Sequence, residues 1–321
     1  MNDVQHIQQL AAKINEVRSE IGKVIIGQND VVDQLLMSLF AKGHCLLVGV
    51  PGLAKTLLIR TLANSLDLSF SRIQFTPDLM PGDITGTEVI EDDRSTGQKA
   101  FRFVKGPVFA NIVLADEINR TPPKTQAALL EAMQEHSVTA AGTTYRLSEP
   151  FFVLATQNPI EQEGTYPLPE AQLDRFMFNL WLDYPSFDEE VEVVRSTTVE
   201  TSPTIRHIMN GEDIVAAQNL VRRVPVADNV IQHAVKLVHA TRPATSDNKV
   251  VKDFLAYGAG PRASQYLVLG AKARAAMSGR PTPEIADVNA VALPVLRHRI
   301  VTNFNAEAEG MTADKIISSL L

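Results

Sequence analysis

The stretch that decides the fold is Gly49-Val50-Pro51-Gly52-Leu53-Ala54-Lys55-Thr56, which follows the apolar run at residues 45–48. A strand that leads into a glycine-bearing loop and then a helix directs several backbone N–H groups to one point, which forms a cradle for phosphate. In such a loop Lys55 reaches the β- and γ-phosphates of a nucleotide, and the Thr56 hydroxyl ligates magnesium. Alanine at position 54 replaces the usual glycine before the lysine, but one methyl group leaves the cradle intact. The strand before it and the helix after it argue against a chance turn.

A second apolar run, at residues 111–115, ends in the two acids Asp116 and Glu117. A buried parallel strand delivers such side chains to the carboxyl edge of its sheet, where nucleotides bind. We therefore expect Asp116 to hold the magnesium shell and Glu117 to polarise the attacking water. Adjacent acids also suit a solvated turn. Beside a phosphate loop they favour hydrolysis, because transfer to a small hydroxyl substrate needs no carboxylate dedicated to water.

Three further polar residues indicate the kind of nucleotide hydrolase. Asn158 ends a third apolar run and could orient the water, although an amide there also fits an ordinary strand-ending turn. Arg175 follows a short helix and could stabilise transition-state charge in a neighbouring subunit's site. Its alternative is a surface ion pair with Asp174 or Glu170. Arg262, in the first turn of an expected helix, could fold back onto the γ-phosphate.

With these segments in this order, the chain resembles the MoxR family of AAA+ ATPases. The resemblance assigns residues 49–56 as Walker A, 112–117 as Walker B, Asn158 as sensor 1, Arg175 as the arginine finger and Arg262 as sensor 2. It implies ATP and Mg²⁺ as cofactors, with the metal on Thr56 and Asp116 and with catalytic roles for Lys55, Glu117, Asn158 and Arg175. The nucleotide-binding positions that it implies are Gly27, Gln28, Gly49, Val50, Pro51, Gly52, Leu53, Ala54, Lys55, Thr56, Leu57, Asp116 and Arg262.

The pattern of strands and helices predicts an α/β fold. Apolar runs at residues 45–48, 70–75, 111–115, 151–156 and 178–181 alternate with helical segments, which indicates a five-stranded parallel sheet sandwiched by helices. Beyond residue 185 helical patterns dominate. We expect a nucleotide-binding domain at 1–185, a linker at 186–204 and an all-helical lid domain at 205–321, with ATP bound between the sheet domain and the lid.

Two hairpins are predicted within the first domain, near residues 86–104 and 137–147. The resemblance assigns them as the helix-2 insert and the pre-sensor-1 hairpin, which face the ring pore and push on substrate in magnesium chelatase and minichromosome maintenance helicases. It further implies a homo-oligomeric ring, a hexamer, that acts on protein clients. The implied work is chaperone-like assembly or activation of protein complexes or insertion of metal cofactors, often beside partners with a von Willebrand factor A domain.

Composition limits the partners. The net charge of −7, from 30 basic and 37 acidic residues, makes nucleic acid an unlikely substrate. A nucleic-acid motor that uses Lys99 and Arg102 stays an alternative, as does an ATP-gated scaffold with negligible turnover.

No apolar run suggests membrane insertion, and the N-terminus lacks the pattern of a secretory signal, so we expect a cytoplasmic protein. The single cysteine, Cys45, is expected to be buried, whereas His298, between Arg297 and Arg299, is expected at a solvated helix end.

Overall fold

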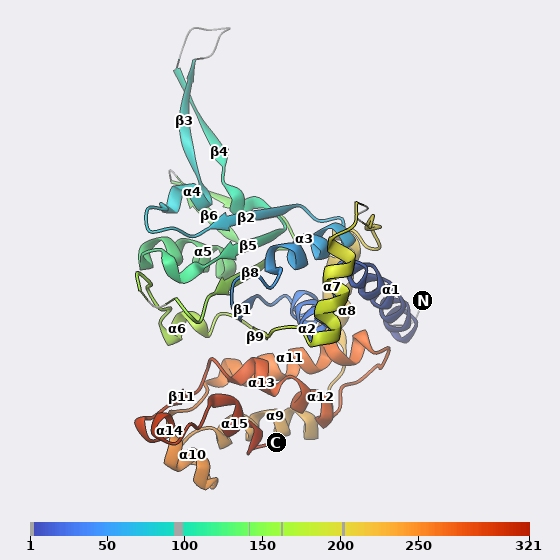
Figure 1. Ribbon diagram of the computed structural model, residues 1–321, viewed down its shortest axis with the longest axis vertical. Coiled ribbons are helices and arrows are strands. Elements are labelled where there is room, and N and C mark those ends of the chain that lie inside the picture. Colours follow the sequence, from blue (N-terminus) through green and yellow to red (C-terminus); the bar gives the residue numbers. More distant parts are fainter. Residues whose placement is uncertain (1–2, 93–98, 141, 162, 201–202) are drawn as a thin grey trace.

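A computed structural model describes residues 3–92, 99–140, 142–161, 163–200 and 203–321. Its centre is a parallel sheet of five strands in the order β2–β5–β8–β1–β9 (Figure 1). The predicted α/β class with five parallel strands is confirmed. The strands are β1 (Cys45–Gly49), β2 (Phe70–Gln74), β5 (Ile112–Asp116), β8 (Phe152–Gln157) and β9 (Phe178–Leu182).

The sheet is buried on both faces, which explains why its strands are continuous apolar runs. Successive residues point to opposite faces: Cys45 and Leu47 join one hydrophobic core, and Leu46 joins the other. The first core packs against helices α1 (Asp3–Gly22), α2 (Asn29–Phe40) and α3 (Lys55–Ser65). The second packs against α5 (Pro123–Glu135). Cys45 is fully buried, as expected for a structural thiol.

Two antiparallel hairpins extend from this domain. One pairs β3 (Gly86–Asp92) with β4 (Lys99–Lys105), and it projects from one end of the molecule in Figure 1. The other pairs β6 (Ser137–Ala140) with β7 (Thr143–Arg146). Phe103 of the first hairpin stacks on Tyr145 of the second with 4.2 Å between ring centroids, so the two hairpins brace each other. Positions 93–98 and 141 of the expected hairpin tips lie outside the described residues.

The C-terminal half is mainly helical but includes a small sheet, which corrects the all-helical expectation for the lid. Strands β10 (Leu255–Tyr257) and β11 (Val301–Thr302), which flank the segment from α11 to α13, pair antiparallel. Val291 separates two short helices, and Pro294, in the first turn of the second one, cannot donate a backbone hydrogen bond across that break. The helices are α8 (Gly211–Arg223), α9 (Asp228–Ala240), α10 (Lys249–Phe254), α11 (Pro261–Met277), α12 (Ile285–Ala290), α13 (Ala292–Leu296), α14 (Phe304–Ala308) and α15 (Ala313–Ser318).

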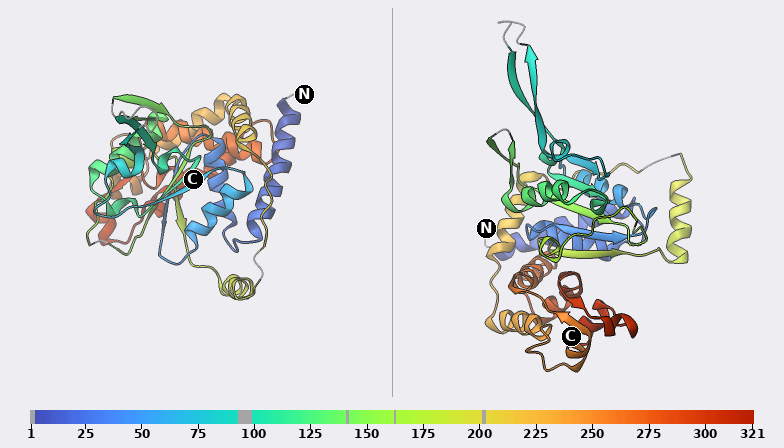
Figure 2. Two further views of the ribbon diagram at one scale, coloured as in Figure 1. Left: turned by 90° about the horizontal axis from the view of Figure 1, so that it is seen from above. Right: turned by 90° about the vertical axis from the view of Figure 1, so that its left-hand side faces the viewer.

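Helix α7 (Phe187–Thr197) has 11 residues, none of which is fully buried, and Figure 2 shows it set apart from the remaining helices. It begins with Ser186, whose hydroxyl accepts a hydrogen bond from the Glu189 amide. The chain then returns to the body, where buried Glu20 of α1 accepts hydrogen bonds from the backbone and side chain of Arg206. Positions 201–202 of the expected linker lie outside the described residues.

Short helical segments complete the chain: α4 (Pro81–Thr85), α6 (Glu170–Leu173) and the single 3-10 turns Pro107–Phe109 and Ile118–Arg120. None of the helices in the described part of the chain combines the length and hydrophobicity needed to span a bilayer.

Candidate nucleotide-hydrolysis site

The phosphate loop connects β1 to α3, as its sequence predicts. Gly52 and Ala54 have φ values of +87° and +55°, so both lie in the left-handed region. This explains why glycine usually occupies position 54, since a left-handed backbone costs about 1–2 kcal/mol for a residue with a Cβ. The Lys55 ammonium donates to the Gly49 carbonyl oxygen at 2.5 Å, across the loop. The loop therefore places a cation and the start of α3 around one point.

Asp116 lies at the carboxyl end of β5, and both of its carboxylate oxygens are hydrogen-bonded. Its Oδ2 accepts from Arg72 Nε at 3.0 Å and Nη2 at 2.6 Å. Its Oδ1 accepts from the Thr156 hydroxyl at 2.6 Å. The Thr156 oxygen also accepts from the Glu117 amide at 2.9 Å, so β8 fixes both acids.

Glu117 follows Asp116 with a φ of +57°, which turns its side chain away from the strand. Its Oε2 accepts from Gln74 Nε2 and from Arg120 Nη1, each at 3.0 Å. Arg72 and Gln74 were not predicted as site residues. Because they are two positions apart on β2, they lie on the same face of the strand, and Gln74 is the register partner of Asp116.

Lys55, Asp116 and Glu117 also interact electrostatically. Burial lowers the pKa of Lys55, while the charges of Asp116 and Glu117 oppose that change. The three predicted residues are therefore within one electrostatic site.

A cavity of about 340 Å³ adjoins the phosphate loop, which is large enough for a small ligand. One wall is α7, and the described lining includes no residue of the lid; binding of ATP between the sheet domain and the lid stays a prediction. Gly27, with φ +74°, faces α7, where a Cβ would be 2.5 Å from the Glu189 carboxyl carbon. The lining residues are Val24, Ile25, Ile26, Gln28, Pro51, Gly52, Leu53, Ala54, Leu57, Leu58, Tyr184, Pro185, Glu190, Val193, Ser196 and Thr197.

A magnesium nucleotide fits these residues. The cavity is walled by apolar side chains beside Gln28, as a purine base requires, and it opens onto the phosphate loop with its left-handed turns. Thr56 and Asp116 supply the oxygen donors that magnesium prefers. A bound metal would contact Asp116 alongside Arg72, or would take the place of Arg72 at that carboxylate.

Asn158 is buried directly beyond β8, near Thr156. Its Oδ1 accepts from the Ile160 amide at 3.1 Å, which is the geometry of a strand-ending turn. The water-orienting role of Asn158 stays a prediction.

Arg175 and Arg262 lie together, and neither lines the nucleotide cavity. Arg175 Nη1 donates to the Leu130 carbonyl at 3.0 Å, and Arg262 Nη1 donates to Asp174 Oδ2 at 2.8 Å. In Figure 1, α6, which precedes Arg175, lies away from α3, which begins at Lys55. The folding of Arg262 back onto the γ-phosphate therefore stays a prediction, and in this structure its guanidinium pairs with Asp174. Asp174, the alternative ion-pair partner of Arg175, instead pairs with Arg262 and Arg299.

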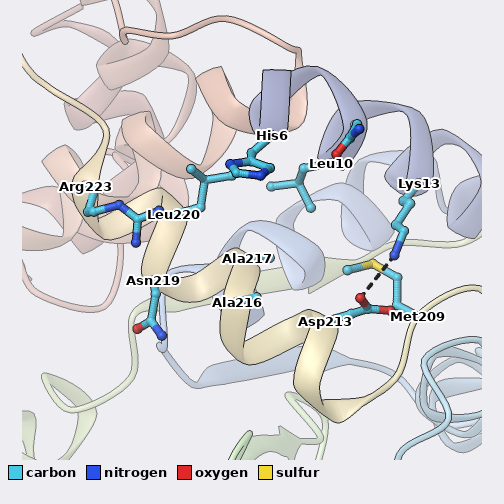
Figure 3. Close-up of a pocket in the computed structure, with 11 residues that line it drawn as sticks. His6, Leu10, Lys13, Met209, Asp213, Ala216, Ala217, Asn219, Leu220 and Arg223 are labelled. Carbon is cyan, nitrogen blue, oxygen red and sulfur yellow. Dashed lines mark ion pairs between the residues drawn. The ribbon is translucent and has the colours of Figure 1, made fainter. Parts of the chain in front are cut away.

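A larger cavity, of about 430 Å³, lies between α1 and α8 and shares no lining residue with the nucleotide cavity (Figure 3). Lys13 and Asp213 form an ion pair of 3.1 Å there.

The strand order, the phosphate loop and the acid pair define a P-loop hydrolase of the AAA+ class. Residues 44–178 match the model of the ATPase family associated with various cellular activities, and residues 248–320 match the AAA lid domain. The chain is 43% identical to Chaperone MoxR1 of Mycobacterium tuberculosis over 97% of its own length and 82% of that protein. It is 30% identical to Protein MoxR of Paracoccus denitrificans, with coverages of 92% and 90%.

A crystal structure of a Cytophaga hutchinsonii protein superposes with a TM-score of 0.91, at 44% identity, covering 98% of this chain and 95% of the other. The chain belongs to the MoxR family of AAA+ ATPases.

Proposed function

We propose that this ATPase hydrolyses ATP at the subunit interfaces of a homo-oligomeric ring, a hexamer, and uses the cycle to remodel protein clients. One observation carries the proposal: Lys55, Asp116 and Glu117 form one site, while Arg175 and Arg262 lie together elsewhere. The arginines that the described part of the chain places beside these acids, Arg72 and Arg120, are already paired with Asp116 and Glu117. A second copy would supply an arginine to the phosphates.

Each residue of the site then has a role in the reaction. The loop backbone and Lys55 hold the β- and γ-phosphates. Thr56 and Asp116 would hold a magnesium ion, which would neutralise phosphate charge. Glu117 accepts the proton of the attacking water, and its left-handed backbone and two hydrogen bonds fix its direction.

Arg175 and Arg262 of the adjacent copy would meet the developing charge on the γ-phosphate. In the isolated chain their guanidinium groups are held by the Leu130 carbonyl and by Asp174. Both contacts are partly exposed, so an incoming phosphate can compete for them.

The exposed side chains on the hairpin of β3 and β4 favour protein as the class of client. Ile90 and Phe101 form a cross-strand pair, and their side chains are 59% and 71% exposed. Apolar side chains on a projecting hairpin suit unfolded or loosely folded protein better than nucleic acid, whose backbone needs basic side chains. Arg102 of the same hairpin is paired with Glu91 at 2.6 Å. The relative named Chaperone MoxR1 agrees with this client class. A partner with a von Willebrand factor A domain, and insertion of metal cofactors, are finer versions of the same proposal.

The test measures ATP hydrolysis against protein concentration, with light scattering on the same samples, for wild type and Arg175→Ala. We expect specific activity to rise with assembly. Arg175→Ala should assemble but lose roughly three to five orders of magnitude in rate. Arg223→Ala is the control, because it also removes a guanidinium group, but one that pairs with Asp3 beside the groove between α1 and α8. Activity independent of concentration, or normal hydrolysis by Arg175→Ala, would leave an ATP-gated scaffold or a self-contained site instead.

A further inference from the structure

Arg299 is an almost completely buried cation. It contacts the connection at residues 174–177, which carries Arg175 and is called the arginine turn below. The Arg299 side chain is 1% exposed, and all five of its N–H groups donate hydrogen bonds. Nε donates to Asp174 Oδ1 at 2.8 Å. Nη1 donates to the carbonyls of Met177 at 3.2 Å and Val295 at 2.5 Å, and Nη2 donates to those of Asp174 at 2.9 Å and Phe176 at 2.5 Å. The expectation of a solvated helix end at His298 is therefore wrong, because His298 and Arg299 are both buried.

Four of these five bonds go to residues 174–177, the connection between α6 and β9 that carries Arg175. This connection has no helix or strand hydrogen bonds to occupy its carbonyl groups, and buried carbonyls need partners. The guanidinium supplies them from a fixed planar fork. The Arg299 side chain thereby contacts the backbone on both sides of Arg175.

The lid also holds the same turn from α11. The Tyr266 hydroxyl donates to the Arg175 carbonyl at 3.3 Å, and the Arg299 guanidinium lies over the Tyr266 ring, 5.0 Å from its centroid. Arg262 pairs with Asp174 from the start of that helix. His298 Nε2 also lies 3.0 Å from the Phe176 carbonyl oxygen, so four lid side chains contact the arginine turn of their own chain.

We propose that Arg299 is a positioning residue for Arg175, and that it makes the lid of one subunit control hydrolysis in the next. A shift of the lid moves Arg299 and Tyr266, and with them the backbone that aims Arg175 at the neighbouring phosphates. Misplacement of a catalytic group by about 1 Å lowers a rate by roughly a hundredfold. The inference rests on the proposed function, in which Arg175 acts on the adjacent site.

The first variant is Arg299→Lys, which keeps the charge but cannot form the planar fork. We expect kcat to fall by roughly ten- to a hundredfold while KM for ATP stays within about twofold, because the variant's own phosphate loop is untouched. The matched control is Arg280→Lys. Arg280 donates to buried Asp287 with two nitrogens, so the variant perturbs a comparable ion pair in the lid that does not touch residues 174–177.

Mixed assemblies separate positioning from loss of structure. Glu117→Gln subunits lack their own base but present an intact Arg175. In excess, they should restore hydrolysis at the sites of Arg299→Lys subunits, and equally at those of Arg175→Ala subunits. If Arg175→Ala is not rescued, the shared-site function fails. If Arg175→Ala is rescued but Arg299→Lys is not, or if Arg280→Lys has the same kcat defect, the positioning role is overturned.

A milder variant covers the case in which Arg299→Lys does not fold. Tyr266→Phe removes only the hydroxyl bond to the Arg175 carbonyl. Its melting temperature should match wild type, its kcat should fall severalfold, and Glu117→Gln subunits should restore it. A wild-type kcat for Tyr266→Phe, together with an unfolded Arg299→Lys, would make Arg299 a residue of stability alone.

Discussion

Replacing Glu117 with glutamine should separate nucleotide binding from hydrolysis. Glu117 Oε2 accepts hydrogen bonds from Gln74 and Arg120, each at 3.0 Å, and the amide oxygen of glutamine can accept both. The loss is the charge attraction to Arg120, whose side chain is 43% exposed, so it amounts to less than about 1 kcal/mol. Affinity should therefore change by no more than about fivefold. The missing base should slow hydrolysis by roughly 10² to 10⁴, about 3–5 kcal/mol of activation free energy.

The assay compares single-turnover hydrolysis of labelled ATP with equilibrium binding of a fluorescent nucleotide, both on assembled protein. Gln74→Ala is the control, because it removes one donor to Glu117 and leaves the carboxylate in place. Hydrolysis by Glu117→Gln within tenfold of wild type would refute the assignment of Glu117 as the base. A more than tenfold loss of nucleotide affinity would show that its pairing with Arg120 contributes more than a half-exposed contact should.

Two further predictions concern stability. Asp287→Ala should lower the free energy of unfolding by about 3–5 kcal/mol in urea titration, because it leaves Arg274 and Arg280 without their buried carboxylate; an unchanged midpoint would contradict this. Acid should destabilise the fold in two steps. Burial lowers the pKa of His44 to about 4. As the pH falls, His44 therefore takes up its proton in the unfolded chain before it does so in the folded one, and the free energy of unfolding drops by about 2 kcal/mol between pH 7 and 5. Hydrogen bonds from Lys23 and Arg206 lower the pKa of Glu20 to about 2, so its contribution persists above pH 4.5 and is lost as the pH falls toward 2. A urea midpoint that stays constant from pH 7 to 5 would contradict the His44 step.

Much of the sheet and the Walker residues could be predicted because their chemistry is local in sequence. An apolar run that ends in Asp116 and Glu117 is decided by burial and by the carboxyl edge of a parallel sheet. The phosphate loop is likewise one continuous segment. Arg72 contacts Asp116 across a 44-residue separation, so its role depends on strand order, which the local pattern does not contain.

That α7 forms a wall of the nucleotide cavity could not be predicted from the sequence, for a different reason. Helix α7 buries no side chain completely, so its pattern indicates a charged surface helix and gives no direction for its contacts. Its position depends on backbone contact at Gly27, where no side chain carries a signal. Arg299 was missed because burial of a charged residue is rare unless every donor is paired, and its partners are mainly backbone carbonyls.

The packing of the lid decides how an ATPase cycle can move this chain. Helix α11 approaches β9 so closely that a Cβ on Gly270 would lie 3.3 Å from the Phe178 ring and 3.2 Å from Val291. One hydrophobic core runs from α1 through β9 into α11 and α13, so rotation of the lid against its own sheet would expose apolar surface. Helix α7 has no such core contact and borders the nucleotide cavity. Within one subunit, α7 is therefore the element that can move in response to nucleotide at the lowest free-energy cost. The lid moves together with the arginine turn, because Arg299 connects the two.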